Sequence, residues 1–489
     1  MNINMKEIVK NTSIYSFGRL ASKAIGFLMI PLYTSFLTPA DYGIFELLTM
    51  LVMILGIMIQ GGISSAMFKF YNSCEDKSDK KEYISTIFIF VNVVCFVLCI
   101  LSSLFSGYLS YALFADGKYG YHVILMLISF FFSIVTTVPE TYLMVQKKSK
   151  QYAIMSLVLL FISLSLNIYF VAFAKLAVLG VLYASIIARI LHAAYLMKIT
   201  LPEIGLKFDI NKLKTVLTFS IPMIPAELGM FVFACSDRFF LSHMSNLSEV
   251  GIYSLGYKFA FMLSFLVIQP FMQVWEQEMY EISGKEGAET IFGRIYIYLV
   301  CAVMFSGLLM SVFIKEVIEL VATSQFHSAW KVVPFIALAY VFRASYYYFR
   351  MAMFIKSKTL SLSKVTVIGA LFSLLLNYIL IPRYGAIGAS IATLCSYFIL
   401  SATTFVLSQK LVKMRIESVN LCKIMLISLV TFIVYSKITL DFVILTMLLK
   451  TTSIPLLLVF VWLSGIFTEE EKLKMKDMVF QKLTRAKIG

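Results

Sequence analysis

The chain has 489 residues, of which 60% are hydrophobic and 14% are charged, and its formal net charge is +15. Soluble domains are about 45–50% apolar and about 25% charged, so this composition predicts a membrane protein. No basic domain lies outside the apolar segments, which excludes a nucleic-acid-binding role and leaves membrane topology to explain the positive charge.

Apolar stretches, each long enough to cross a bilayer as a helix, recur from residue 12 to residue 466. Residues 88–105 are apolar without alternation, which favours helices over the strands of a membrane barrel. We expect an all-α integral membrane protein with about 14 transmembrane helices. They begin near Thr12, Gly43, Ile84, Val123, Tyr152, Val178, Thr215, Gly251, Ile291, Val332, Val365, Ala386, Leu421 and Val443.

The distribution of basic residues predicts the orientation of the chain. Most of the 42 Lys and Arg residues fall on one side if the even-numbered turns and both termini share that side. Both termini are therefore expected in the cytoplasm. The first helix lacks a cleavage pattern and is expected to be retained. Residues 468–489 open with a Thr468/Glu471 capping pattern and alternate apolar residues with lysines, which predicts a basic amphipathic tail on the cytoplasmic surface.

The sequence repeats itself at an offset of 208 residues (41 to 249). "DYGIFEL" matches "EVGIYSL", "KKSK" matches "IKSK" and "VLGVLYAS" matches "AIGASIAT" at this offset, and Asn167 matches Asn377 at a nearby one. We expect two parallel six-helix lobes with a substrate site between them. The predicted parts are an N-terminal lobe at 1–205, a C-terminal lobe at 206–415, two further helices at 416–467, and the tail at 468–489. Alternatively, the repeated pieces only shape turns.

Several cations lie inside the apolar stretches, where an Arg or Lys facing lipid costs about 2.5–3.5 kcal/mol. Arg19 and Lys23 are four residues apart and Arg343 and Arg350 are seven apart, so each pair shares one helix face. These cations do not recur at the repeat offset, which favours a cationic substrate cavity over lobe packing. The alternative for Arg350 is that its side chain reaches the membrane surface.

Asp237 and Arg238 interrupt the apolar run "FVFACSDRFFLSHM". Because they are adjacent, we expect them to face different ways, with Arg238 pairing across helices and Asp237 taking another partner. A buried polar seam that binds substrate and a structural ion pair are both compatible with this pattern. Asp237, Glu140 and Glu227 are candidate counter-ions or coupling-ion sites, and Glu140 directly follows Pro139, where a helix can kink.

The chemistry of the predicted cavity favours an anionic, lipid-linked substrate. Guanidinium groups match phosphate oxygens in geometry and charge, so a lipid-linked phosphate or pyrophosphate fits better than a cationic drug. The aromatic stretch at 339–354 is expected to form an interfacial belt with a packed helix side, the alternative being a surface that stacks sugar rings. The sequence has no phosphate-binding loop of the ATPase type and no metal-ligand spacing, and we expect no cofactor. A membrane glycosyltransferase or polymerase is disfavoured because no large loop carries catalytic residues.

Three segments carry a resemblance over essentially the whole chain: "NTSIYSFGRLASKAIGFLMIPLYTSFLTPADYGIFEL", "FSIPMIPAELGMFVFACSDRFFLSHMSNLSEVGIYSL" and "LNYILIPRYGAIGASIAT". The sequence resembles the Wzx-type polysaccharide flippases of the multidrug/oligosaccharidyl-lipid/polysaccharide exporter superfamily. The resemblance implies a 14-helix, two-lobed, non-enzymatic flippase in a bacterial cytoplasmic (inner) membrane. Coupling to sodium or protons is left open. Such a flippase would move polyprenyl-pyrophosphate-linked oligosaccharide units outward for O-antigen, capsule or exopolysaccharide assembly, alongside other membrane proteins of polysaccharide assembly.

The resemblance also implies roles for particular residues. In related lipid II flippases, basic residues of the first helix contact the lipid-linked pyrophosphate, and the matching positions here are Arg19 and Lys23. Family members often carry Asp-Arg late in the seventh helix, matched by Asp237 and Arg238. The alternative function is that of the superfamily's ion-coupled multidrug exporters, for which an acidic cavity would be expected.

Overall fold

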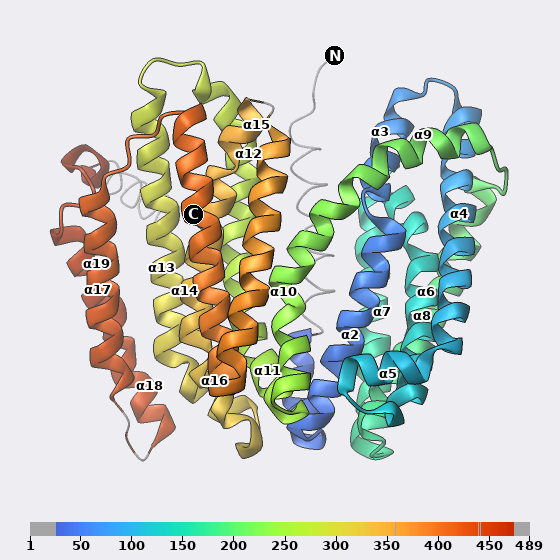
Figure 1. Ribbon diagram of the computed structural model, residues 1–489, viewed down its shortest axis with the longest axis horizontal. Helices are drawn as coiled ribbons and strands as arrows, with labels where there is room; N and C mark the ends of the chain where they lie inside the picture. Colours follow the sequence, from blue (N-terminus) through green and yellow to red (C-terminus); the bar gives the residue numbers. More distant parts are fainter. Residues whose placement is uncertain (1–25, 357, 439, 441, 474–489) are drawn as a thin grey trace, which may run out of the picture. The chain divides into compact units, whose positions relative to one another are not determined.

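The computed structural model describes residues 26–356, 358–438, 440 and 442–473, and these residues form helices joined by short connections (Figure 1). Within them, 11 helices are long and apolar enough to cross a membrane, or up to 12 if a bent pair at 324–355 counts as one span. The expected all-α membrane fold is confirmed. The number of about 14 spans stays a prediction, because most of the first lies outside the described residues.

The helices have the following bounds. The first part of the chain contains α2 (Pro39–Gln60), α3 (Ile63–Ser73), α4 (Lys77–Leu104), α5 (Ser106–Phe114), α6 (Gly120–Val145), α7 (Ser149–Asn167), α8 (Ala177–Ile204) and α9 (Ile210–Ser220). The second part contains α10 (Ile224–Met244), α11 (Leu247–Leu263), α12 (Gln269–Ser283), α13 (Ala288–Val321), α14 (Val333–Phe349), α15 (Met351–Ile355), α16 (Thr359–Leu411), α17 (Ser418–Ser436), α18 (Val443–Thr451) and α19 (Ser453–Leu463).

Local sequence explains where two of these helices begin and bend. α2 starts with a capping box, in which the Asp41 N–H donates to Thr38 Oγ1 at 3.2 Å and the Thr38 N–H donates to Asp41 Oδ2 at 3.0 Å. The spans predicted at Val365 and Ala386 lie together in α16, which is broken where Gly385 adopts a φ of 54°. The Ala386 N–H freed by this break donates to Glu249 Oε2 at 2.8 Å.

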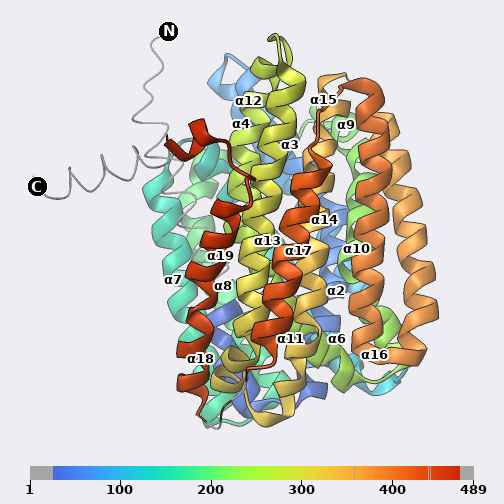
Figure 2. The same cartoon turned by 90° about the vertical axis from the view of Figure 1, so that its left-hand side faces the viewer.

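The chain divides into two compact units. Unit 1 comprises 1–255, 321–328 and 370–389, and unit 2 comprises 256–320, 329–369 and 390–489. In unit 1, α4, α6 and α8 run side by side (Figure 1), and buried apolar side chains of α2, α3, α4 and α6 form a core. In unit 2, α13 lies next to α17 and α19 (Figure 2), and their apolar side chains pack together. The predicted lobe boundaries stay a prediction.

A pair of glycines at the repeat offset forms a reciprocal helix contact within unit 1. A methyl group added at Gly43 would strike the carbonyl oxygen of Leu247, and one added at Gly251 would strike the carbonyl oxygen of Pro39. Each added carbon would also lie 3.1 Å from the backbone nitrogen of the other glycine. Since Pro39 and Leu247 are equivalent in the repeat, α2 and α11 cross about a local two-fold axis, as in an isologous interface.

Further equivalent positions have equivalent surroundings in unit 1. A methyl group at Gly180 would lie 2.8 Å from the carbonyl oxygen of Phe170, and one at Gly388 would strike the carbonyl oxygen of Leu380. Ala177 and its equivalent Gly385 both have positive φ, at 48° and 54°.

Asn167 and Asn377 both bond a hydroxyl on a helix outside their own. The Tyr33 hydroxyl donates to Asn167 at 2.9 Å, and Asn377 donates to the Ser236 hydroxyl at 3.1 Å. The repeated motifs thus have matching structural surroundings. A repeated structure explains their common offset better than the alternative that each motif only shapes a turn.

Candidate functional site

Arg343 lies on α14 among tyrosines. Its Nη1 donates to Tyr340 Oη at 3.2 Å, and its Nε and Nη2 donate to Tyr347 Oη at 3.2 and 3.0 Å. The rings of Tyr340, Tyr347 and Tyr397 lie 5.2, 5.5 and 5.7 Å from the guanidinium carbon. Of the carboxylates in the described residues, none is within ion-pair distance of Arg343, so aromatic rings and hydroxyls hold this partly buried cation.

Helical spacing produces this arrangement. Positions 340, 343, 347 and 350 are spaced by three, four and three residues, so their side chains share one face of α14 and its C-terminal end. Tyr340, Tyr346 and Tyr348 are almost fully buried within the protein. These positions form the packed helix side expected of this stretch, and the interfacial belt stays a prediction.

Arg350 is joined to Arg343 through Tyr347. The guanidinium carbon of Arg350 lies 4.5 Å from the Tyr347 ring centre, on which Arg343 also packs. Unlike Arg343, Arg350 has a carboxylate, because Glu276 of α12 lies 3.5 Å away with an exposed side chain. The two arginines, which were predicted to share a helix face, thus form one cluster linked by Tyr347. Glu276 partly neutralises the charge of Arg350.

Asp237 and Arg238 are buried on α10, and they pair with each other. Arg238 Nη1 lies 3.2 Å from Asp237 Oδ1 and 2.7 Å from the carbonyl oxygen of Ala234, and Nε donates to Ser254 at 3.1 Å. The Tyr253 hydroxyl donates to the other Asp237 oxygen. As expected, Arg238 bonds across helices and Asp237 has a further partner, but the two neighbours also pair with each other, because the long Arg238 side chain folds back over the preceding helical turn. The predicted polar seam exists between α10 and α11.

The other predicted acidic residues do not join this seam. Glu140 on α6 lies 3.8 Å from His192 Nε2 on α8, and the α6 and α8 pair belongs to the core of unit 1. Glu227 is exposed near the start of α10. Arg19 and Lys23 lie outside the described residues, so their predicted role stays a prediction.

Sequence reasoning missed a buried ion pair in unit 2. Lys450 Nζ of α18 donates to Glu316 Oε1 of α13 at 2.6 Å and to the carbonyl oxygen of Val312 at 2.9 Å. Both side chains are almost fully buried. An acidic residue inside an apolar helix pattern was the available signal, because a carboxylate in that setting requires a partner.

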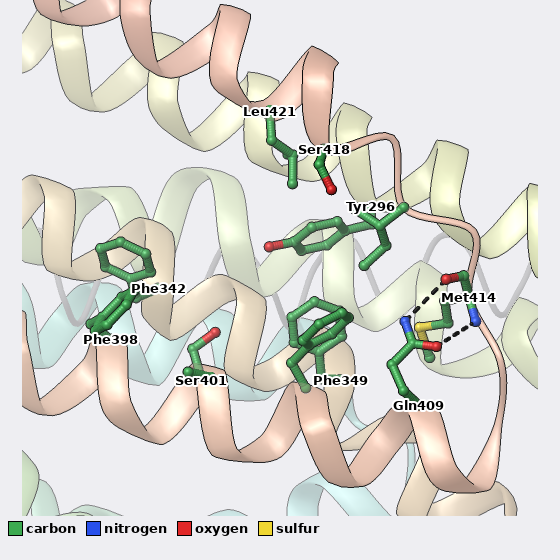
Figure 3. A pocket seen from close by; sticks show the side chains of 12 residues that line it. Tyr296, Phe342, Phe349, Phe398, Ser401, Gln409, Met414, Ser418 and Leu421 are labelled. Carbon is green, nitrogen blue, oxygen red and sulfur yellow. Dashed lines mark hydrogen bonds between the residues drawn. The ribbon is translucent and has the colours of Figure 1, made fainter.

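An aromatic cavity of about 280 Å³ lies between α13, α14, α16 and α17. Figure 3 shows the rings of Tyr296, Phe342, Phe349 and Phe398 along it. Its few polar side chains include Gln409, which bonds the backbone N–H and carbonyl of Met414, each at 3.0 Å (Figure 3). This lining favours apolar groups over charged ones. Among the described residues, no group of three metal-binding side chains occurs.

Comparisons with solved structures identify the fold. The structure titled lipid II flippase MurJ, inward closed conformation, superposes with a TM-score of 0.76 at 16% identity, covering 93% of this chain and 99% of that one. An inward-facing multidrug resistance MATE family transporter of the MOP superfamily gives a TM-score of 0.62 at 15% identity, covering 79% of this chain and 94% of that one. The chain therefore has the fold that these transporters share.

Sequence comparisons identify the family. An uncharacterized membrane protein of Methanocaldococcus jannaschii, MJ1068, is 20% identical over 430 residues, which are 81% of this chain and 82% of the relative. The family described as polysaccharide biosynthesis protein matches residues 8–275. Since that match covers more than half of the chain, the protein belongs to the polysaccharide biosynthesis protein family.

Proposed function

We propose that this protein is a flippase that moves polyprenyl-pyrophosphate-linked oligosaccharide units from the cytoplasmic to the outer leaflet of a bacterial cytoplasmic membrane. Family membership supports a role in polysaccharide assembly, and the fold is shared with a lipid II flippase. The polysaccharide is an O-antigen, a capsule or an exopolysaccharide. Transport occurs by alternating access and is coupled to sodium or protons, with Glu140, Glu227 and Asp237 as the candidate coupling groups.

The observation that carries this proposal is the environment of Arg343. A cation inside a transmembrane helix normally pairs with an anion, because an uncompensated charge there is costly. Tyrosine rings and hydroxyls surround Arg343, and no described carboxylate pairs with it. Its guanidinium can therefore still bind an anion. A pyrophosphate would supply oxygen acceptors that match this guanidinium fork in geometry and charge.

The neighbouring residues extend the same argument. Arg350 adds a second cation seven residues away on the same helix face. Its ion pair with the exposed Glu276 carboxylate is weak enough for a pyrophosphate to replace that carboxylate. Tyrosine hydroxyls can donate to phosphate or sugar oxygens once substrate replaces their present contacts. Arg19 and Lys23 are proposed as further substrate contacts, whereas Arg238, the other candidate, is already paired with Asp237.

Binding of undecaprenyl-pyrophosphate oligosaccharide to the purified protein in nanodiscs tests the proposal. Arg343→Gln should weaken binding by about 1.5–3 kcal/mol, the usual contribution of hydrogen bonds to charged groups. The matched control is Arg383→Gln, which removes an exposed arginine of α16. Binding of the unaltered protein should also weaken as the salt concentration rises.

Two outcomes would contradict the proposal. Equal affinities of Arg343→Gln and the unaltered protein would remove Arg343 from the site. No binding of the lipid-linked oligosaccharide, together with ion-driven uptake of a cationic dye by proteoliposomes, would instead assign the protein to multidrug export.

A further inference from the structure

A second, cationic cavity of about 550 Å³ lies in unit 2, separate from the arginines of α14. Three connections build it: the turn between α12 and α13, the turn after α15, and the linker between α16 and α17. All three fall on the side that the distribution of basic residues assigns to the cytoplasm. Its charged lining residues are Lys285, Lys356, Lys413, Arg415 and Glu289.

The linker after α16 divides this cavity from the aromatic one. Residues 413–417 have no regular secondary structure, and the Ile416 N–H donates to the Met414 carbonyl oxygen at 3.1 Å. Lys413 and Arg415 line the cationic cavity, whereas Met414 and Ile416 line the aromatic cavity. The basic and the apolar residues of this linker therefore line different cavities, one charged and one apolar.

The positive charge of the cavity is largely uncompensated. Glu289 lies 3.9 Å from Arg415, and both side chains are substantially exposed. Lys285, Lys356 and Lys413 form no ion pair with any described residue. Three lysines that converge on one cavity without forming ion pairs repel each other, and an anion placed among them would relieve that repulsion.

Backbone contacts fix the walls of the cavity. The Arg415 N–H donates to the carbonyl oxygen of Glu289 at 2.9 Å. Gly293 packs so closely on the linker that an added methyl group would strike the carbonyl oxygen of Arg415. The linker is thus held against the first turns of α13, and the cationic side chains project from a defined frame.

We propose that this cavity binds a phosphate-bearing anion at the cytoplasmic membrane surface. Its ammonium and guanidinium groups suit phosphate oxygens, and basic pockets between transmembrane helices at this level commonly take anionic lipid headgroups. A phospholipid headgroup and a free phosphate ion share this chemistry. The site differs from the proposed transport site because Arg343 and Arg350 do not line it.

Native mass spectrometry of the purified full-length protein tests this site, with phosphatidylglycerol, phosphatidylcholine and inorganic phosphate as three separate probes. The test variant is Lys356→Gln/Lys413→Gln. The matched control is Lys147→Gln/Lys150→Gln, which removes two exposed lysines from the same predicted membrane side. The melting temperature of each variant verifies that it is folded.

We expect phosphatidylglycerol to bind the unaltered protein more tightly than phosphatidylcholine, and the test variant to bind it roughly tenfold to thirtyfold more weakly. The control should bind as the unaltered protein does. Binding of inorganic phosphate alone, lost in the test variant, would support the site and identify a soluble anion as its ligand. Equal binding by the test and control variants with every probe would overturn the proposal.

Discussion

Arg238 and Arg343 both lie within transmembrane helices, but they meet the requirement for charge compensation in different ways. Arg238 folds back onto the adjacent Asp237 and is further held by Ser254 and a backbone carbonyl. Arg343 is surrounded by tyrosines, and no described carboxylate pairs with it. In the first arrangement the positive charge is neutralised within the protein, as in a structural ion pair. The second leaves a cation ready for an external anion, so the partner of a membrane arginine indicates its role better than its position does.

Removing the carboxylate of the closed pair should have the largest effect on stability. Asp237→Ala leaves Arg238 buried without its adjacent anion, and breaking a buried pair in this way costs about 3–5 kcal/mol. Thermal unfolding of the purified protein in detergent measures this loss. The double variant Asp237→Ala/Arg238→Gln should lose less, because it removes the buried guanidinium as well. An equal loss in the single and double variants would show that Arg238 does not depend on Asp237.

Substitution of Arg343 should have the opposite result, with substrate binding affected more than stability. Arg343→Lys keeps the positive charge but loses the planar fork, so lipid-linked oligosaccharide binding should weaken by about 1–2 kcal/mol. Its unfolding free energy should change by less than about 1 kcal/mol, because the tyrosine contacts tolerate a smaller cation. Binding and melting measurements on one preparation check this split. A large loss of stability with unchanged affinity would place Arg343 with Arg238 as a structural residue.

Arg350 lies between the two extremes and should become more like Arg343 when its carboxylate is removed. Glu276→Gln frees the Arg350 guanidinium from an exposed ion pair. The affinity for the lipid-linked pyrophosphate should then rise by about 0.2–1 kcal/mol, the usual contribution of an exposed pair. Titration of the variant beside the unaltered protein measures this gain. Weaker binding would instead mean that Glu276 contacts the substrate.

A fourth arginine, Arg294 near the start of α13, pairs with Glu471, which lies outside the spans, so the pH dependence of this pair can be tested. Arg294 donates to Glu471 Oε1 at 2.8 Å, and this hydrogen bond is the main cause that lowers the pKa of Glu471 from 4.5 to about 2. The pair should therefore stabilise the protein fully above about pH 4.5 and lose its contribution as the pH falls toward 2. Glu471→Gln should lower the melting temperature at pH 7 by a few degrees. That difference should shrink on acidification, and a difference independent of pH would contradict the ion pair.

The sequence predicted helices and shared helix faces well, and partners poorly. The spacing of Arg343 and Arg350 is a local property of one helix, and the structure brings them together through Tyr347. The pairing of Asp237 with Arg238 was not predicted, because side-chain reach, and not backbone direction, decides whether neighbours meet. Glu316 was missed because its partner Lys450 is 134 residues away, and only tertiary packing joins them.

The crossing of α2 and α11 has the geometry of a homodimer interface contained in a single polypeptide. In a true homodimer, any mutation is copied to both sides of the interface at once. Here each side is encoded separately, so one side can change while the other stays fixed. Positions 39 and 247 have already diverged to proline and leucine, whereas positions 43 and 251 are both glycine. The two sides therefore differ at the positions that contribute only a backbone carbonyl to the contact, and they agree at the positions where any side chain would strike the partner helix.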